Sequence, residues 1–583
     1  MIGNDGKTVA WTRTGVGQGD PWGGLFFEVG MHPALLQLAQ EVKNVEAQLN
    51  RQRPDNPVLR PGSVSAYEDD TQVRGELDVI FRVAPRIEGI FAQHGFAVSV
   101  PKSKITGSEV ENYLDQAPDG FAIDSEGLIA LGVPVGSDHY RRSTTETKVK
   151  SMEPPAEALK LLRPRTALQL LLSCISPRPS FLFRTAPDPS VTHKAAREFD
   201  ASMITAVAAI FKLEVSPDLA KRVHLPLRMG GFGLTRHHGM ASEKNQILSR
   251  TFYTAFLAQH YPSELQTTQQ LYELSEVRLG AVENKTEATE ITDLVMATIT
   301  DKNCYQILAD GMKKAQKQTY KDIHIAAISA GLFSKAAWIL SAATSTTAYL
   351  TSTIGIDNDG YFGAAEFRCA GRNTLGYGPR TTALGERHTC TCRHVYDPLM
   401  EPFHGMSCAN NKGFRNRRHN DLRDLLYKLI KRRYPALTPA QLELETVVGQ
   451  APDREGALRE VKGDVIWWSE GEKLIIDIMC IDVGCKSYLE PPVSSYQSAE
   501  RAAVHAEEVK RRNYARVTIP APIRPACVLP FIVEASGRLG PVALSVINRI
   551  CGTQTYMKST FLKEISMITA KYTGLMLKAT QDQ

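Results

Sequence analysis

A pair of adjacent aspartates, Asp69 and Asp70, is the first set of residues that could do chemistry. The pair lies between two short runs rich in β-formers, residues 63–66 and 71–73, which predicts a hairpin with both carboxylates at its tip. Carboxylates placed in this way hold divalent metal ions, and such ions serve phosphoryl transfer. A solvated turn would explain the same pair without any chemistry.

A second pair, Asp464 and Asp477, lies on two predicted strands that span 462–468 and 473–482. Asp477 alternates with aliphatic residues on a strongly apolar strand, and burying its charge without a partner would be costly. A metal ion or a nearby cation would compensate for that cost. We expect Asp482, at the end of the same strand, to be solvated.

Three cysteines and one histidine within nineteen residues form a third candidate site: Cys390, Cys392, His404 and Cys408. Three thiolates and one imidazole are suitable ligands for a closed tetrahedral zinc site, so we predict one bound Zn²⁺. The one-residue gap between the first two cysteines is shorter than in most zinc fingers. His388 and His394 compete as ligands.

A basic segment follows this cluster directly. Residues 412–433 carry nine Lys or Arg against two Asp, and leucines at helical spacing predict an amphipathic helix over 420–433. Arginines bind phosphates and base edges in a bidentate manner, so the segment predicts contact with nucleic acid. A solvated basic helix face is the alternative. The predicted contact residues are Arg415, Arg417, Arg418 and His419.

The composition of the chain is that of an ordinary globular protein. Its 583 residues are 43% hydrophobic and 22% charged, with a formal net charge of +5, which suits about three or four domains. The amino terminus lacks the apolar core of a secretory signal, so we expect the ten cysteines to be reduced. Residues 325–350 contain Lys335 and many hydroxyls, which predicts a buried helix and no membrane span.

The order of these segments resembles the C-terminal part of a site-specific non-LTR (LINE-type) retrotransposon protein. Residues 17–21 (Gly-Gln-Gly-Asp-Pro), the Asp69–Asp70 pair and residues 225–234 are similar to successive parts of a reverse transcriptase palm and thumb. The resemblance implies an RNA-directed DNA polymerase with both aspartates as metal ligands. In that family a further metal-binding aspartate lies well upstream, so we expect the polymerase to be truncated and inactive. The alternative is a complete polymerase whose upstream part precedes Met1.

The C-terminal segment resembles the restriction-like PD-(D/E)xK endonuclease of the same proteins. The resemblance implies that Asp464 and Asp477 hold Mg²⁺ or Mn²⁺ against the scissile phosphate. Gly463 stands where proline is usual, and Met479 stands where a lysine is usual. Lys510, on a later predicted helix, would replace that lysine.

The resemblance also implies target-primed reverse transcription, in which target DNA is nicked and the element's RNA template is copied. The implied location is the nucleus. The alternative function is a catalytically dead nucleic-acid-binding relic. Separations of more than about 8 Å between the nuclease residues would favour the relic, because metal–oxygen bonds are short.

The predicted fold class is a multidomain α+β and α/β protein. We expect the last domain to fold alone and to nick DNA. The predicted domains are a partial reverse transcriptase palm (1–105), a palm edge and helical thumb (106–250), a helical linker (251–380), a CCHC zinc cluster with its basic helix (381–435) and a restriction-like α/β endonuclease (440–583).

Overall fold

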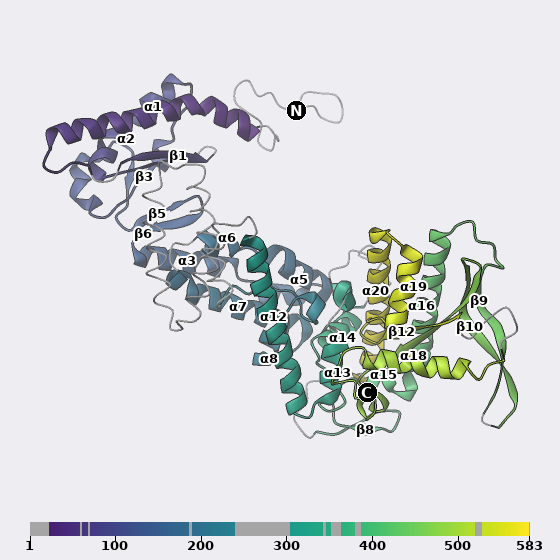
Figure 1. Ribbon diagram of the computed structural model, residues 1–583. Helices are drawn as coiled ribbons and strands as arrows, with labels where there is room; N and C mark the ends of the chain where they lie inside the picture. The colour runs from purple at the N-terminus through teal and green to yellow at the C-terminus, as the bar shows by residue number, and fades with distance from the viewer. Residues whose placement is uncertain are drawn as a thin grey trace, which may run out of the picture. The chain divides into compact units, whose positions relative to one another are not determined.

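In the computed structural model the chain forms two compact units, which we describe separately (Figure 1). The first unit comprises residues 1–148 and 185–195, and the second comprises residues 149–184 and 196–583. The structure describes residues 23–58, 61–67, 70–185, 189–238, 304–341, 345–350, 363–378, 386–453, 455–518 and 527–581.

The first unit is built on two helices and a hairpin: α1 (Gly23–Gln52), β1 (Ser63–Tyr67), β2 (Asp70–Arg74) and α2 (Leu77–Gln93). Buried residues recur along α1 every three or four positions, which places them on the face that packs against α2. They are Met31, Ala34, Leu38, Val42, Val45 and Leu49. The hairpin predicted around the aspartate pair is confirmed.

Two small sheets complete the first unit. Strand β3 (Lys104–Ile105) runs parallel to β4 (Ala122–Ile123), and β5 (Gly127–Ala130) forms a hairpin with β6 (Val133–Gly136). The residues that join β5 and β6, Leu131 and Gly132, both have positive φ. Two such residues in succession match the right-handed twist of a two-residue hairpin.

Between residues 138 and 374 the regular structure that is described is helical. Helices were expected over these residues, and whether they form a thumb and a linker stays a prediction; residues 239–303 lie outside the described chain. No helix of the described ranges is long and apolar enough to span a bilayer. The helices of eight residues or more are α3 (Asp138–Met152), α7 (Pro189–Phe211), α12 (Cys304–Ser329), α13 (Phe333–Ser341) and α14 (Ala364–Thr374), and the shorter ones are α4 (Ala156–Leu161), α5 (Pro164–Leu170), α6 (Ser180–Thr185) and α8 (Pro217–Val223).

The second unit contains a four-stranded mixed sheet in the order β12-β11-β10-β9. Strands β9, β10 and β11 are antiparallel neighbours, whereas β12 is parallel to β11 and follows a helical crossover. The strands are β9 (Leu442–Pro452), β10 (Leu458–Ser469), β11 (Glu472–Ile481) and β12 (Val528–Glu534), and the helices around them are α16 (Lys412–Arg433), α17 (Lys486–Leu489), α18 (Arg501–Tyr514), α19 (Pro541–Cys551) and α20 (Thr555–Gln581).

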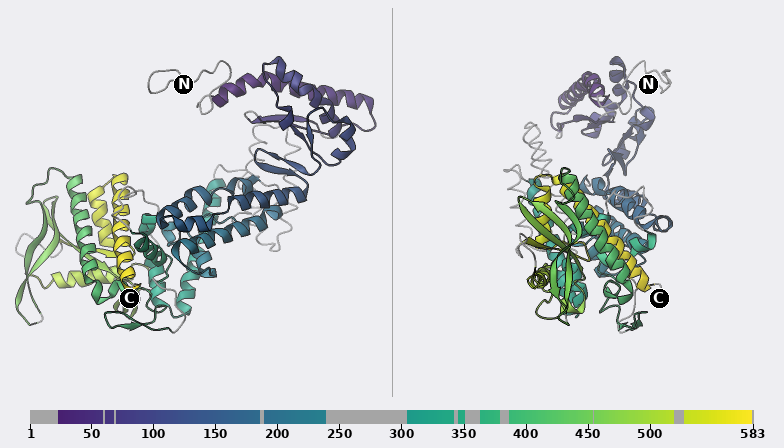
Figure 2. Two further views of the ribbon diagram at one scale, coloured as in Figure 1. Left: turned by 180° about the vertical axis from the view of Figure 1, so that it is seen from behind. Right: turned by 90° about the vertical axis from the view of Figure 1, so that its right-hand side faces the viewer.

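The two faces of this sheet are covered by different helices. Leu474, Ile476 and Ile478 of β11 belong to one large core with α16, α19 and α20, which lie side by side (Figure 2). Ile475, which alternates with them, packs against Tyr514 at the end of α18. Asp477 lies two residues after Ile475 and therefore on the same face of the strand, as the sequence predicts.

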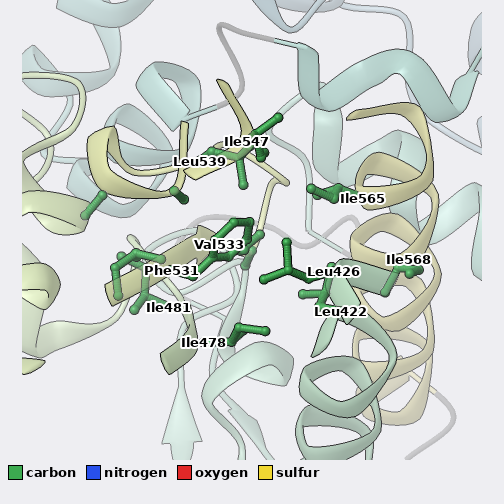
Figure 3. Packing of buried hydrophobic residues seen from close by; sticks show 14 of the residues in the cluster. Leu422, Leu426, Ile478, Ile481, Phe531, Val533, Leu539, Ile547, Ile565 and Ile568 are labelled. Atoms are coloured by element: carbon green, nitrogen blue, oxygen red, sulfur yellow. The ribbon is translucent and has the colours of Figure 1, made fainter. Parts of the chain in front are cut away.

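Helix α16 is part of the core of the sheet and not of a separate module. Leu422 and Leu426 pack among Ile478, Phe531 and Ile565 in Figure 3. Burying a leucine side chain stabilises a fold by about 1.5–3 kcal/mol, so α16 contributes substantially. The predicted boundary at residue 440 therefore divides one core, and the coarser prediction of a multidomain, mixed helix-and-sheet protein is the one that holds.

Candidate functional site

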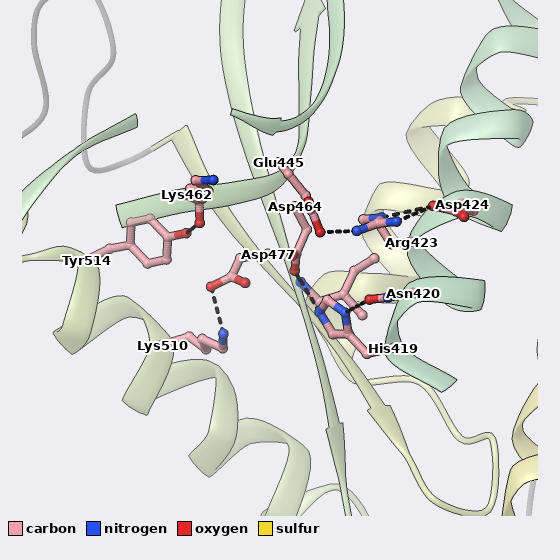
Figure 4. A network of polar contacts seen from close by, with 11 residues as sticks. His419, Asn420, Arg423, Asp424, Glu445, Lys462, Asp464, Asp477, Lys510 and Tyr514 are labelled. Carbon is pink, nitrogen blue, oxygen red and sulfur yellow. Dashed lines mark hydrogen bonds and ion pairs between the residues drawn. The ribbon is translucent and has the colours of Figure 1, made fainter. Parts of the chain in front are cut away.

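The β10–β11 hairpin brings Asp464 and Asp477 to neighbouring positions. Its two-residue turn consists of Glu470 and Gly471, with φ of 54° and 80°. This turn pairs Val465 with Ile476, and the same register carried one position further places Asp464 beside Asp477. Figure 4 shows both carboxylates between helices α16 and α18.

Asp464 is held by two donors that share one of its oxygens. Its Oδ2 atom accepts a hydrogen bond of 2.7 Å from the backbone N–H of Ile478 and one of 3.1 Å from Nε2 of His419. Burial alone would raise the pKa of this carboxyl group, but the hydrogen bond and charge of His419 and the N–H of Ile478 hold the pKa below its usual value. Asp464 is therefore the carboxylate that stays ionised.

Asp477 has the opposite electrostatic environment. It is 7% exposed, and burial raises its pKa to about 6 although Lys510 partly offsets the shift. The Nζ atom of Lys510, on α18, lies 2.8 Å from Oδ2 of Asp477. The carboxylate of Asp464 adds repulsion. The structure thus brings together all three residues of the predicted nuclease site.

Besides His419, two side chains beside this site were not predicted as parts of it. The pairing of Gly463 with Thr446 and of Val465 with Leu444 places Glu445 next to Asp464 on the side away from β11. Arg423 of α16 forms an ion pair with Glu445, so an exposed third carboxylate lies at the site already neutralised.

Gly463 has a steric role in the strand that carries Asp464. A Cβ atom at this position would lie 2.7 Å from the side chain of Ile466 and 2.8 Å from that of Ile475. Contacts this short force a neighbour to move, so the glycine keeps β10 close to its flanking side chains. This accounts for a glycine at position 463 of this chain.

The predicted zinc ligands lie together in a compact loop of the second unit. Strands β7 (His388–Thr389) and β8 (Val395–Tyr396) form a short hairpin that carries the first two cysteines, and α15 (His404–Ser407) carries the histidine. The ligand atoms of Cys390, Cys392, His404 and Cys408 all lie within 4.8 Å of one another. These four residues could hold a metal ion such as zinc.

The distances in this cluster fit a tetrahedral ion. The Sγ atoms of Cys390 and Cys408 are 3.6 Å apart, and Sγ of Cys392 is 3.4 Å from Nε2 of His404. Zinc bonds of about 2.3 Å to sulfur and about 2.0 Å to nitrogen imply separations of about 3.8 Å and about 3.5 Å. Burial raises the pKa of Cys408 to about 11, so metal binding there would release a proton.

The competing ligands His388 and His394 do not belong to the four-residue cluster, although the ring of His394 stacks on that of His404 at 4.7 Å between centroids. His394 belongs to a second possible group with Glu401 and His404, and its Nε2 atom lies 3.0 Å from Glu401. His394 and Glu401 are exposed, whereas the thiols of Cys390 and Cys408 are buried. Soft thiolates in a buried loop are the better zinc ligands.

The prediction that four basic residues contact nucleic acid requires correction. Arg418 is 2% exposed, and Arg415 donates hydrogen bonds to the carbonyl oxygens of Met406 and Cys408. His419 is bonded to Asp464, so Arg417 alone of the four is exposed. The other three have structural partners or lie in the interior.

The expectation that Asp482 is solvated is wrong. Asp482 is half-buried, and burial raises its pKa to about 6, while the N–H of Gly484 and the nearby charges of Arg418 and Arg415 lower it only in part. The end of β11 is covered by the start of α16 and by the cysteine–histidine loop, which the strand pattern alone does not indicate.

The first unit gives less information on the other aspartate pair. Asp70 begins β2 and is paired with Tyr67, whereas Asp69 lies outside the described residues.

Comparison with known proteins gave no relatives: no family model matches this chain, and no curated protein matches it.

Proposed function

We propose that the second unit is a DNA endonuclease that depends on Mg²⁺ or Mn²⁺, within a retrotransposon-type protein of target-primed reverse transcription. The observation that carries the proposal is the convergence of Asp464 and Asp477 on adjacent strands, with Lys510 at 2.8 Å from the second carboxylate. The accompanying RNA-directed DNA polymerase, with Asp69 and Asp70 as its metal ligands, is proposed from the sequence resemblance alone.

The donor set suits a hard cation. The bonds from His419 and Ile478 end on Oδ2 of Asp464 and the bond from Lys510 ends on Oδ2 of Asp477, while the two carboxyl groups also lie close enough to interact with each other. Mg²⁺ and Mn²⁺ prefer carboxylate oxygens and would remove the repulsion between the two acids. A bound ion would polarise the scissile phosphate and lower the pKa of an attacking water.

Lys510 has the position to act on the same phosphate. Its ammonium group is partly exposed and fixed by Asp477, so it can stabilise the negative charge that develops as the phosphodiester is attacked. His419 helps to keep the carboxylate of Asp464 ionised at neutral pH, and the ionised carboxylate is the form that binds metal.

The substrate would be held by exposed basic residues of α16. Arg417, Lys428 and Arg432 are exposed on this helix, and phosphate contacts by such side chains supply sequence-independent affinity. Target DNA and the element's RNA are the proposed partners, and the proposed location is the nucleus.

The test is nicking of supercoiled plasmid by the full chain. We expect nicking with Mg²⁺ or Mn²⁺ and none with EDTA, and we expect Asp464→Ala and Asp477→Ala to abolish it while DNA binding persists. Lys510→Ala should slow nicking by about 10²–10³-fold, as removing a transition-state donor typically does. Glu472→Gln, on the exposed turn of the same hairpin, is the matched control. Nicking by folded Asp477→Ala at the parental rate would refute the assignment.

The second candidate function is nucleic-acid binding without catalysis. It is favoured by the ion pairs of Asp477 with Lys510 and of Glu445 with Arg423, which satisfy acidic groups at this site without a metal. A chain that binds DNA, and whose acidic site takes up no Mn²⁺ in a calorimetric titration, would support this function.

A further inference from the structure

His419 reaches the acidic site from a helix that precedes the sheet. It lies on α16, 45 residues before Asp464 in the sequence, and its Nε2–H donates to Oδ2 of that aspartate. Together with the N–H of Ile478 this bond fixes the carboxylate by one oxygen and leaves Oδ1 without either bond. A metal-binding carboxylate held in this way cannot rotate freely.

The first turns of α16 are fastened to the cysteine–histidine cluster. Arg415 donates from Nη1 to the carbonyl oxygen of Cys408 at 2.6 Å and to that of Met406 at 3.3 Å. Asn411, directly before the helix, donates to the carbonyl oxygen of Gly405 at 2.7 Å and to that of Met576, on α20, at 3.0 Å. The helix thus begins on the loop that contains the last two cluster residues.

The later turns of α16 are held by the core, against which Phe414 of the first turn also packs. Leu422, Leu426, Leu429 and Ile430 are buried in the core of the sheet. His419 lies one turn after Arg415 and before the first of these leucines. Its position therefore depends on the turns that the cluster fixes as well as on the core.

We propose that His419 is a positioning residue for Asp464 and that zinc in the Cys390–Cys408 cluster holds it in place, so that zinc binding strengthens binding of Mg²⁺ or Mn²⁺ at the acidic site. The inference rests on the proposed nuclease function for its second metal. Without zinc, the loop no longer fixes Arg415, the turns over 412–419 fray, and Asp464 loses one of its two donors.

The expected size of the effect follows from the loss of an outer-shell partner. Removing such a residue typically lowers metal affinity about 10–100-fold. Because coupling between two binding sites is reciprocal, saturating Mn²⁺ should strengthen zinc binding by the same factor by which zinc strengthens Mn²⁺ binding.

Calorimetric titration of Mn²⁺ into the zinc-loaded full chain tests the positioning role. We expect His419→Ala to weaken Mn²⁺ binding about 10–100-fold. His419→Gln, which keeps an N–H donor of similar reach, should recover part of that loss. Asn416→Ala changes an exposed residue of the same two turns and should leave the affinity unchanged.

A double-mutant cycle tests the zinc connection. Cys408→Ser should weaken Mn²⁺ binding, and the double variant with His419→Ala should be no weaker than the worse single variant, because both changes remove one contact. Hydrogen exchange of the Cys408→Ser variant should accelerate over 412–420 and stay slow over 422–430. Slow exchange over the later turns also verifies that this variant is folded.

Two outcomes separate this inference from the proposed function. If the parent chain binds no Mn²⁺, or if Asp477→Ala removes none of its Mn²⁺ binding, the nuclease proposal fails. If the parent binds Mn²⁺ at this site but His419→Ala or folded Cys408→Ser binds it equally well, or if their effects add in full, the coupling is refuted and the nuclease proposal stands.

Discussion

Asp477→Asn should make the second unit more stable at pH 8 and should change its stability little near pH 4. The residue is 7% exposed, and burial raises the pKa of the carboxyl group from 3.8 to about 6. Asparagine has nearly the same shape and can still accept a hydrogen bond from Lys510. The substitution therefore removes mainly the free energy of ionising a buried acid.

The sign follows from the proton that the fold retains. Well below pH 3.8 Asp477 is protonated in both states, so it contributes no pH dependence there. As the pH rises from about 4 to about 6 the unfolded chain releases this proton and the folded chain keeps it, so the parent loses stability. A shift of about two units at 1.36 kcal/mol each gives about 3 kcal/mol, fully present above pH 6.

Divalent metal should remove most of the difference in stability between the two proteins. A ligand at one hundred times its Kd stabilises the folded state by about 2.7 kcal/mol, and the asparagine variant lacks one of the two ligands. We therefore expect saturating Mg²⁺ or Mn²⁺ to bring the parent to about the stability that the variant has without metal.

Native-state hydrogen exchange of the β10 and β11 amides is the suitable assay, because the chain has two units and need not unfold in one step. Exchange free energies are compared at several pH values with EDTA and with Mn²⁺. Glu472→Gln, at the exposed start of β11, is the control. A variant less stable than the parent at pH 8, or a difference that is constant with pH, would refute the reasoning.

Three further predictions concern the second unit. Cys408→Ser should lose about one equivalent of zinc by metal analysis, whereas Cys485→Ser, outside the cluster, should keep it; equal zinc in both would contradict the ligand assignment. The isolated fragment 440–583 should lack a cooperative thermal transition, because the leucines of α16 are missing from its core; a sharp transition would show that α16 is dispensable. Gly231→Ala should lower the melting temperature because its Cβ atom would lie 2.0 Å from a backbone carbonyl oxygen, whereas Gly413→Ala meets no atom within 4 Å and should preserve it.

The acidic hairpin was predictable because its information is local. Alternation of apolar residues gives the faces of β11, and the Glu470–Gly471 turn gives the register that places Asp464 beside Asp477. Lys510 lies 33 residues beyond Asp477, and its place came from the sequence resemblance. Spacing alone could not have provided it.

Contacts of longer range were missed. The bond from His419 to Asp464 depends on how α16 packs, and the place of Glu445 depends on an irregularity in β10 between Val461 and Lys462. Neither contact can be predicted from the local pattern of apolar and polar residues.

Arg418 is a different kind of error, because its signal is present in the sequence. It precedes Leu422 by four residues, and Leu426 and Leu429 continue the same spacing, so helical periodicity places Arg418 on the apolar face of α16. The charge of Arg418 favours a surface position, whereas the helical periodicity favours the core, and the structure agrees with the periodicity. A charged group at a core position of a helix needs nearby groups of suitable charge, and Arg418 lies close enough to Asp482 and Cys480 for its charge to lower the pKa of both side chains.

The parallel pairing of β11 with β12 sets the order in which the acidic site can assemble during folding. Asp464 and Asp477 meet across a hairpin with a two-residue turn, which closes on the order of microseconds. Pairing of Asp477 with Pro530, by contrast, must wait for α18 and the chain around it to close a long loop. We therefore expect the carboxylates to come together early and Lys510 to arrive late, so that a half-folded chain holds the acids without the cation beside them.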